Sequence, residues 1–110
     1  MHLDVDAPGL ETTRPQLQRT IFRVVQEGLT NARKHAPTSL VNVTVRGGAE
    51  AGVDLVLSNV VEMDAVESQI PGAGAGLAGL TEWVAIEGGT LTHGIRSGAF
   101  RLCVRLPWRP

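Results

Sequence analysis

Several kinds of residue are scarce or absent in this chain of 110 residues. There is one cysteine, Cys103, so no internal disulfide can form, and we expect the reducing environment of the cytoplasm. There is no tyrosine, and aromatic residues make up only 4% of the chain, which argues against a platform for stacking single-stranded bases. No apolar run reaches the ~18 residues of a membrane span. No basic-then-apolar segment opens the chain as in a signal peptide.

The chain also has no excess of one charge. Ten Lys and Arg residues face eleven Asp and Glu residues, and the net charge is −1. This balance argues against broad attraction to nucleic acid or to an anionic membrane, so we expect neither as a partner. The length and the 43% content of apolar residues are enough for one hydrophobic core but not for two. We therefore expect a single domain over residues 1–110.

Apolar periodicity predicts the secondary structure. Period-two alternation indicates strands, spacings of three and four indicate helices, and glycine or proline marks the boundaries. The predicted elements are an edge strand at 2–6, a helix at 15–35, strands at 40–46 and 53–59, a helix at 77–87, and strands at 90–94 and 100–106. Two hairpins and two helices in this order predict an α/β two-layer sandwich, with a mixed, mainly antiparallel sheet and the helices on one face.

The helix at 15–35 carries the first candidate site. At roughly 100° per residue, Glu27, Asn31 and Lys34 lie within about 60° of one another along one edge of its apolar stripe. Magnesium prefers oxygen ligands and is usually shared between a few protein oxygens and substrate phosphates. Asn31 could therefore bind the ion, Glu27 could hold a reacting water, and Lys34 could offset phosphate charge. The alternative is a solvated helix flank, where these residue types are common.

A second signal is the glycine run at 72–76, which opens the helix at 77–87. Glycines let backbone N–H groups approach an anion, and a helix N-terminus offers free donors. The run lacks the Lys and Ser/Thr of a Walker loop, and no strand precedes it as in a Rossmann turn. By itself it fits a phosphate cradle and a flexible linker equally well. The unpatterned stretch at 60–75 before the helix predicts a lid or binding loop.

Asn59 is the third signal. The alternation of the strand at 53–59 places its side chain on the core side, where an amide needs a hydrogen-bonding partner.

Together these segments resemble the GHKL ATPases, particularly the sensor histidine kinases of the NarL type. VVQEGLTNARKHA at 24–36 resembles their N-box, GAGAGLAGL at 72–80 their second glycine box, and TEWVAIEGGTL at 81–91 the segment that follows it. The specific part is the pattern E-x-x-x-N-x-x-K-H on a helix. The order of boxes and hairpins resembles the Bergerat fold across nearly the whole chain.

The resemblance implies a catalytic domain that binds ATP with magnesium and donates the γ-phosphate to a histidine. It implies that Asn31 ligates magnesium and that Glu27 is the catalytic residue that orients the reaction centre. The residues implied to bind the nucleotide are Asn31, Lys34, His35, Asn59, Gly74, Gly76 and Leu77. His35 also lies on the apolar stripe, so a partly buried imidazole is an equal alternative to a ligand contact.

The resemblance also implies partners outside this chain. No segment resembles a histidine-bearing dimerisation hairpin, so the acceptor histidine is expected on a separate dimerisation domain. We therefore expect a fragment of a longer kinase, with a response regulator downstream and any sensor or membrane span upstream. The domain itself is expected in the cytoplasm.

Two segments depart from the family pattern. Residues 59–63, NVVEM, stand in place of Asp-x-Gly-x-Gly, and residues 81–83, TEW, stand in place of Arg-Glu-Arg. Asn59 can both accept and donate a hydrogen bond, which predicts weaker selection of adenine over guanine than an aspartate would give. The departures keep open the alternative of a degenerate domain that works as a partner-binding module. The resemblance itself leaves a second alternative, a serine kinase of the anti-sigma-factor type from the same superfamily.

Overall fold

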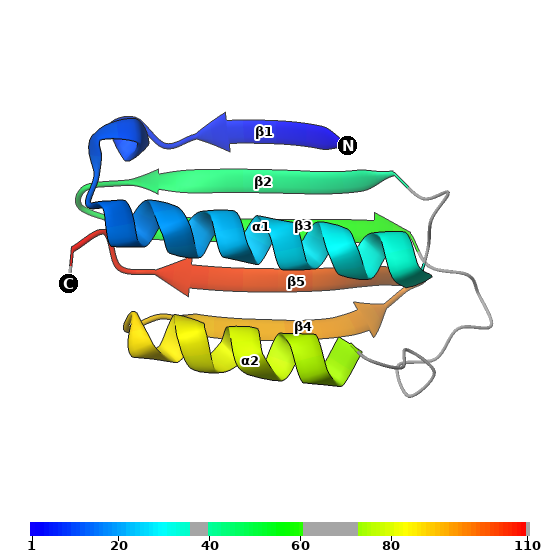
Figure 1. Ribbon diagram of the computed structural model, residues 1–110. Coiled ribbons are helices and arrows are strands. Elements are labelled where there is room, and N and C mark those ends of the chain that lie inside the picture. Colours follow the sequence, from blue (N-terminus) through cyan, green and yellow to red (C-terminus); the bar gives the residue numbers. More distant parts are fainter. Residues whose placement is uncertain (36–39, 61–72, 110) are drawn as a thin grey trace.

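A computed structural model describes residues 1–35, 40–60 and 73–109 of the chain. Within this part, a five-stranded sheet is covered on one face by two helices, so the domain has two layers (Figure 1). The elements are β1 (His2–Asp6), the short 3-10 helix η1 (Leu10–Thr12), α1 (Pro15–His35), β2 (Val41–Gly48), β3 (Gly52–Val60), α2 (Ala73–Ile86), β4 (Thr90–Arg96) and β5 (Ala99–Leu106). The predicted α/β two-layer sandwich is confirmed.

The strand order in the sheet is β1-β2-β3-β5-β4. β1 pairs with β2 in parallel, and the other three pairs are antiparallel. The prediction of a mixed, mainly antiparallel sheet with residues 2–6 at its edge is therefore confirmed. The β4–β5 hairpin turns at Ser97 and Gly98, whose φ angles are 54° and 76°. Two positive φ angles are what a two-residue hairpin turn of type I′ requires.

The alternation of each central strand decides which face of the sheet meets the helices. Val43 and Val45 of β2 lie beside Leu57 and Leu55 of β3, and all four are buried. The residues of β5 that continue these rows are also buried, and polar residues alternate with them on the opposite face. The buried strand residues of the core are Val43, Val45, Val53, Leu55, Leu57, Leu102, Val104 and Leu106.

α1 lies across the middle of the sheet (Figure 1), with the bounds predicted for it. Leu17, Thr20 and Val24 are fully buried on its sheet side. Gly28 continues this row, and a Cβ added there would press against the side chain of Leu57. The lack of a side chain at Gly28 therefore lets the second half of α1 sit close to the sheet.

α2 begins at Ala73, four residues before its predicted start. Gly74 and Gly76 thus lie in the first turn of the helix and not in a loop ahead of it. Glycine has low helix propensity, but Leu77, Leu80 and Val84 anchor the helix in the core, and such packing overrides propensity. The helix ends as predicted at a glycine pair, where Gly88 has a φ of 84° and acts as a left-handed cap.

The strands β2, β3, β4 and β5 all extend beyond their predicted bounds; β3 begins at Gly52 and ends at Val60, and β5 begins at Ala99. β2 continues through Gly47 and Gly48, because both pair with the start of β3, and β4 continues to Arg96. Most of the predicted lid falls at residues 61–72, outside the described part of the chain. Neither α1 nor α2 is both long enough and apolar enough to cross a membrane.

Candidate functional site

Most of the predicted site residues come to one end of the sandwich. α1 and α2 run in opposite directions over the sheet, so the second half of α1 lies beside the first turn of α2 (Figure 1). β3 ends on the same side. Glu27 and Asn31 are on α1, Gly74 and Gly76 are on α2, and Asn59 is near the end of β3. Three elements that are far apart in the sequence thus contribute to one region.

The carboxylate of Glu27 lies directly against Gly76. Glu27 is half-buried, and a Cβ added at Gly76 would overlap its Oε1 atom. The space for the carboxylate therefore exists because residue 76 has no side chain. A pocket of about 250 Å³ adjoins the pair, lined by Arg23, Glu27, Gly76, Gly79, Leu80 and Trp83.

The first turn of α2 brings free donors to this place. The first four N–H groups of an α-helix have no acceptor within the helix, and the dipole places partial positive charge there. In α2 these are the N–H groups of residues 73–76, next to the carboxylate of Glu27. A carboxylate is stabilised at such a helix end, and so is a phosphate.

Asn31 is buried on the sheet side of α1, with 5% of its surface exposed. Its Nδ2 atom has no hydrogen-bond partner among the described residues. A buried polar group left unpaired costs about 1–3 kcal/mol, so Asn31 marks a position where a polar ligand would be stabilised. A rotation of the amide by 180° exchanges its oxygen and nitrogen. The position therefore suits a phosphate oxygen that accepts from the N–H as well as a cation bound by the oxygen.

Lys34 and His35 follow Asn31 along α1. Lys34 is exposed one turn further on, where its ammonium group is free to reach an anion. His35 is the last residue of α1, and its side chain lies outside the described part of the structure. The described residues contain no group of three or more His, Cys, Asp or Glu side chains that could hold a metal ion. Asn31 and Glu27 offer amide and carboxylate oxygens of the kind that magnesium shares with phosphates.

Asn59 is 6% exposed and points to the helix side of the sheet, as its alternation predicted. Its Nδ2 atom donates to the carbonyl oxygen of Val60 at 3.5 Å, which is long for a hydrogen bond. Its cross-strand neighbours are Val41 and Phe100. Among the described residues, the amide of Asn59 therefore makes one long local bond, which a ligand could replace.

The side chain of Leu77 belongs to the core. It is 1% exposed and lies in the same apolar cluster as Leu80 and Val84. Any contact of Leu77 with a ligand would have to come from its main chain. Its side chain instead fixes the first turn of α2 on the sheet.

Two residues of this region were not identified from the sequence. Arg23 places its guanidinium 4.7 Å from the ring centroid of Trp83, and the indole N–H of Trp83 donates to Thr20 Oγ1 at 3.0 Å. Trp83 thus joins α2 to α1 beside Glu27. The sequence contains one signal for Arg23: it precedes Glu27 by four residues, so both lie on the same face of the helix. Trp83 is the half-buried residue of the segment at 81–83 that departs from Arg-Glu-Arg, and its contacts are with Thr20 and Arg23 of α1.

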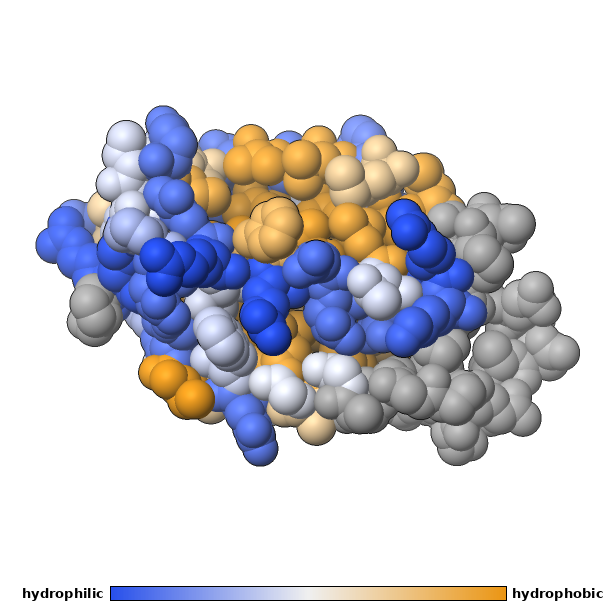
Figure 2. Space-filling view, viewed as in Figure 1, coloured by the Kyte–Doolittle hydropathy of each residue, from blue (hydrophilic) through white to orange (hydrophobic). Residues whose placement is uncertain are grey.

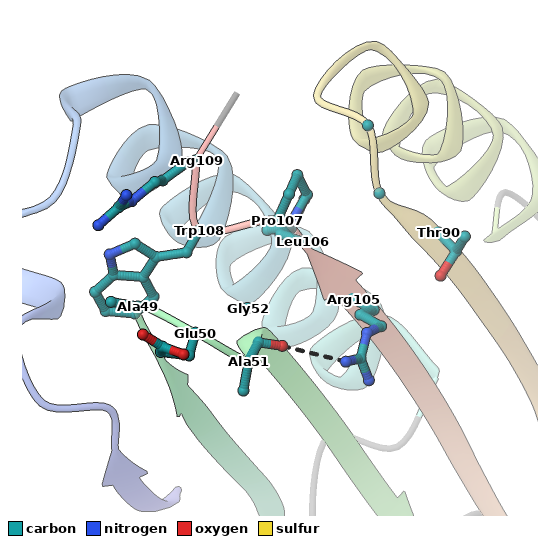
Figure 3. A pocket seen from close by; sticks show the side chains of 12 residues that line it. Ala49, Glu50, Ala51, Gly52, Thr90, Arg105, Leu106, Pro107, Trp108 and Arg109 are labelled. Atoms are coloured by element: carbon teal, nitrogen blue, oxygen red, sulfur yellow. Dashed lines mark hydrogen bonds between the residues drawn. The ribbon is translucent and has the colours of Figure 1, made fainter.

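A different pocket lies at the opposite end of the sheet, around the β2–β3 turn and the segment after β5 (Figure 3). It has a volume of about 360 Å³, and Glu50, Arg105 and Trp108 are among the residues that line it. The guanidinium of Arg105 donates hydrogen bonds there to the carboxylate of Asp54 at 3.3 Å and to the carbonyl oxygen of Ala51 at 3.2 Å. The residues that line this pocket include none of the predicted site residues.

Comparison with known proteins adds a relative by sequence. No family model matches the chain. The chain is 43% identical over 103 residues to the signal transduction histidine-protein kinase/phosphatase UhpB of Salmonella typhimurium. The match covers 90% of this chain and 19% of UhpB, so the chain spans about a fifth of that relative's length.

Solved structures give the same result for the fold. The catalytic domain of histidine kinase ThkA superimposes with a TM-score of 0.66 at 13% identity, over 99% of this chain and 80% of that chain. Full-length ShkA, solved in complex with AMPPNP, superimposes with a TM-score of 0.68 at 19% identity, over 98% of this chain and 26% of that chain. By sequence the chain is a homologue of part of the histidine-protein kinase/phosphatase UhpB, and its fold is that of the histidine kinase catalytic domain of ThkA, in agreement with its resemblance to the NarL-type sensor histidine kinases.

Proposed function

We propose that this chain is the ATP-binding catalytic domain of a two-component sensor histidine kinase. The observation that carries the proposal is the buried amide of Asn31, whose Nδ2 atom has no hydrogen-bond partner among the described residues, one helical turn from Glu27. The homology to UhpB and the AMPPNP complex of ShkA support a nucleoside triphosphate as the ligand. The fold supports it too, because it brings a helix N-terminus to the same end of the domain.

Each residue has a proposed role. Asn31 would hold magnesium through its amide oxygen, while Lys34 and the first-turn N–H groups of α2 would bind phosphate oxygens. Asn59 would contact the base. When bound, the metal ion offsets the negative charge of the phosphates. Phosphoryl transfer otherwise depends mainly on positioning, and Glu27 would supply it by accepting a hydrogen bond from the imidazole N–H of the acceptor histidine.

The other participants lie outside the chain. The acceptor histidine would belong to a separate dimerisation domain, and a response regulator would receive the phosphoryl group from it. The domain would work in the cytoplasm, as part of a parent protein that could be anchored in a membrane.

Thermal unfolding with and without Mg-ATP tests the site. At 100 times the dissociation constant, a single specific site stabilises the folded state by about 2.7 kcal/mol. We expect Asn31→Ala to lose this stabilisation and Asn42→Ala to keep it, because Asn42 is exposed on the opposite face of the sheet. A full shift in Asn31→Ala would contradict the assignment of the metal ligand.

Transfer from ATP labelled at the γ-phosphate tests the reaction. The domain is mixed with the histidine-bearing hairpin of its parent gene, and the labelled product is treated with acid and with base. Phosphohistidine is labile in acid and stable in base, whereas phosphoserine behaves in the opposite way. Acid-stable label would favour the serine kinase, and the absence of any nucleotide-dependent stabilisation would favour a partner-binding module.

A further inference from the structure

An apolar surface lies uncovered between β1 and α1. Leu3 and Val5 of β1 pair in register with Val43 and Val45 of β2, so they point to the side of the sheet that carries the helices. Val43 and Val45 are buried, but Leu3 and Val5 are each 52% exposed. The helical layer therefore stops short of the edge strand.

The flank of α1 that faces β1 is apolar as well. Ile21, Val25 and Leu29 recur every four residues and are only half-buried. At roughly 100° per residue, they lie on the flank opposite Arg23 and Glu27, which line the pocket beside α2. They therefore face β1.

Phe22 lies next to this flank and is 68% exposed. Figure 2 shows the result as a broad apolar area above α1, over the β1 side of the sheet. We call it the β1–α1 surface, and it consists of Leu3, Val5, Ile21, Phe22, Val25 and Leu29. Single exposed apolar residues are normal on a protein, but a contiguous apolar patch is typical of an interaction site. The Glu27 pocket lies on the other flank of α1, so nucleotide binding does not account for this surface.

A basic row borders the β1–α1 surface. Arg19, Gln26 and Arg33 follow one another at intervals of seven residues, which aligns them along the exposed side of α1 next to Phe22. Arg19 and Arg33 are exposed, and neither forms an ion pair with another described residue. α1 carries Arg19, Arg23, Arg33 and Lys34 against the single acid Glu27, although the whole chain has a net charge of −1. The positive charge is thus concentrated on α1.

We propose that the β1–α1 surface docks an amphipathic helix of a partner, with an apolar stripe against the surface and acidic side chains opposite Arg19 and Arg33. Ile21, Val25 and Leu29 form a ridge about 12 Å long that is inclined to the axis of α1, which suits a helix packed across it with anchors one turn apart. The basic row calls for an acidic complement. A second copy of this chain would present the same basic row and lacks that complement on α1. The proposal does not depend on nucleotide binding.

Two synthetic peptides test the proposal on the intact chain. Both are 16-residue amphipathic helices with the same leucine stripe; one carries glutamate on both flanks of the stripe, and the other carries lysine. Binding is measured by fluorescence anisotropy, and the site is located from methyl NMR shifts of Leu3, Val5, Val25 and Leu29. We expect the glutamate peptide to bind at least tenfold more tightly and to shift these methyl groups.

Variants separate the contributions of the surface and the basic row. We expect the glutamate peptide to bind at least tenfold more weakly to Leu3→Ser and to Phe22→Ser. Ile86→Ser is the control and should bind the peptide normally, because Ile86 is an apolar residue, 85% exposed, at the end of α2 and outside the β1–α1 surface. The double variant with Arg19→Glu and Arg33→Glu alters only exposed side chains. We expect it to bind the lysine peptide more tightly than the glutamate peptide. Equal binding of both peptides, no binding, or shifts confined to other residues would overturn the proposal. Concentration-dependent shifts of the same methyl groups without peptide would also overturn it, since the occupant would then be a second copy.

Discussion

Glu27 and Gly76 belong to different helices, yet the carboxylate of one occupies the space that a side chain on the other would fill. The two residues are predicted from separate segments of the sequence, the N-box-like helix and the glycine run. In the structure they form one unit at the first turn of α2. The glycine therefore has a positional role: it leaves room for a carboxylate beside the free N–H groups of a helix.

Gly76→Ala tests this unit. The added Cβ meets Glu27 Oε1, which is the tip of a flexible side chain and can move aside at small cost in stability. Alanine also has a higher helix propensity than glycine. We therefore expect the melting temperature to stay the same or rise, while transfer of the γ-phosphate falls about 100-fold because Glu27 leaves its position.

Gly79→Ala is the matched control for this variant. Gly79 lies three residues further along α2, and a Cβ there meets no atom within 4 Å. The change should stabilise the domain by about 0.5–1 kcal/mol and leave phosphoryl transfer intact. Equal loss of transfer in both variants would mean that helix flexibility, and not the position of Glu27, is what the glycines provide.

Asn31→Leu should make the nucleotide-free domain more stable. Asn31 is buried, and its Nδ2 atom has no partner among the residues that the structure describes; an apolar side chain of similar size removes that penalty, which is worth about 1 kcal/mol or more. The same change should abolish stabilisation by Mg-ATP. Urea unfolding without nucleotide measures the first effect and a melt with Mg-ATP the second. A destabilised variant would show that the amide is satisfied in the free domain.

Asn59→Asp should increase the selectivity of the site for adenine over guanine. Among the described residues, the side chain of Asn59 makes only the 3.5 Å bond to Val60, so we expect its amide to turn to meet either adenine or guanine, whereas an aspartate can only accept hydrogen bonds. We expect the ratio of GTP to ATP dissociation constants to rise about fivefold or more, in line with the discrimination of a well-placed pair of hydrogen bonds. Competition binding of the two nucleotides to both proteins measures it. Equal ratios of the GTP and ATP dissociation constants in the two proteins would mean that Asn59 does not contact the base.

Much of this fold could be predicted because local and tertiary preferences agree. α1 begins at Pro15 and ends at His35, as the prolines at positions 15 and 37 of the sequence predict from local backbone preferences alone. The strand faces follow from a strict period of two, which also placed Asn59 on the buried side. Asn59 could be identified because it is a polar residue in an apolar row of its strand, whereas Asn31 was identified at the edge of the apolar stripe of α1 and by the resemblance of its segment to the N-box.

Other features depend on contacts that no local pattern contains. The first turn of α2 is helical because Leu77 is anchored in the core, against the propensity of the glycines beside it. The role of Trp83 follows from its bond to Thr20 on the other helix. Likewise, the β1–α1 surface exists because α1 leaves Leu3 and Val5 uncovered, and only the packing of the layers reveals this.

Arg14 joins three segments of the chain at the end of the domain away from Glu27. Its guanidinium donates to Glu87 Oε2 at 3.1 Å and to the carbonyl oxygens of Pro107 and Trp108, both at 3.3 Å. It thereby joins the start of α1, the end of α2 and the segment after β5. The side chains of Arg14 and Glu87 are only 20% and 9% exposed, so these bonds are poorly screened by water.

Arg14→Met keeps the apolar stem of the side chain but removes all three bonds. We expect a loss of about 2–3 kcal/mol in urea unfolding, because hydrogen bonds to charged groups are the stronger kind and Glu87 would be left without its partner. Arg46→Met is the control: Arg46 pairs with Asp4 at 3.4 Å, but both side chains are more than half exposed, so its loss should stay below about 0.5 kcal/mol. Similar losses in the two variants would mean that Arg14 is one more surface arginine and that the segment after β5 is held by its apolar contacts alone.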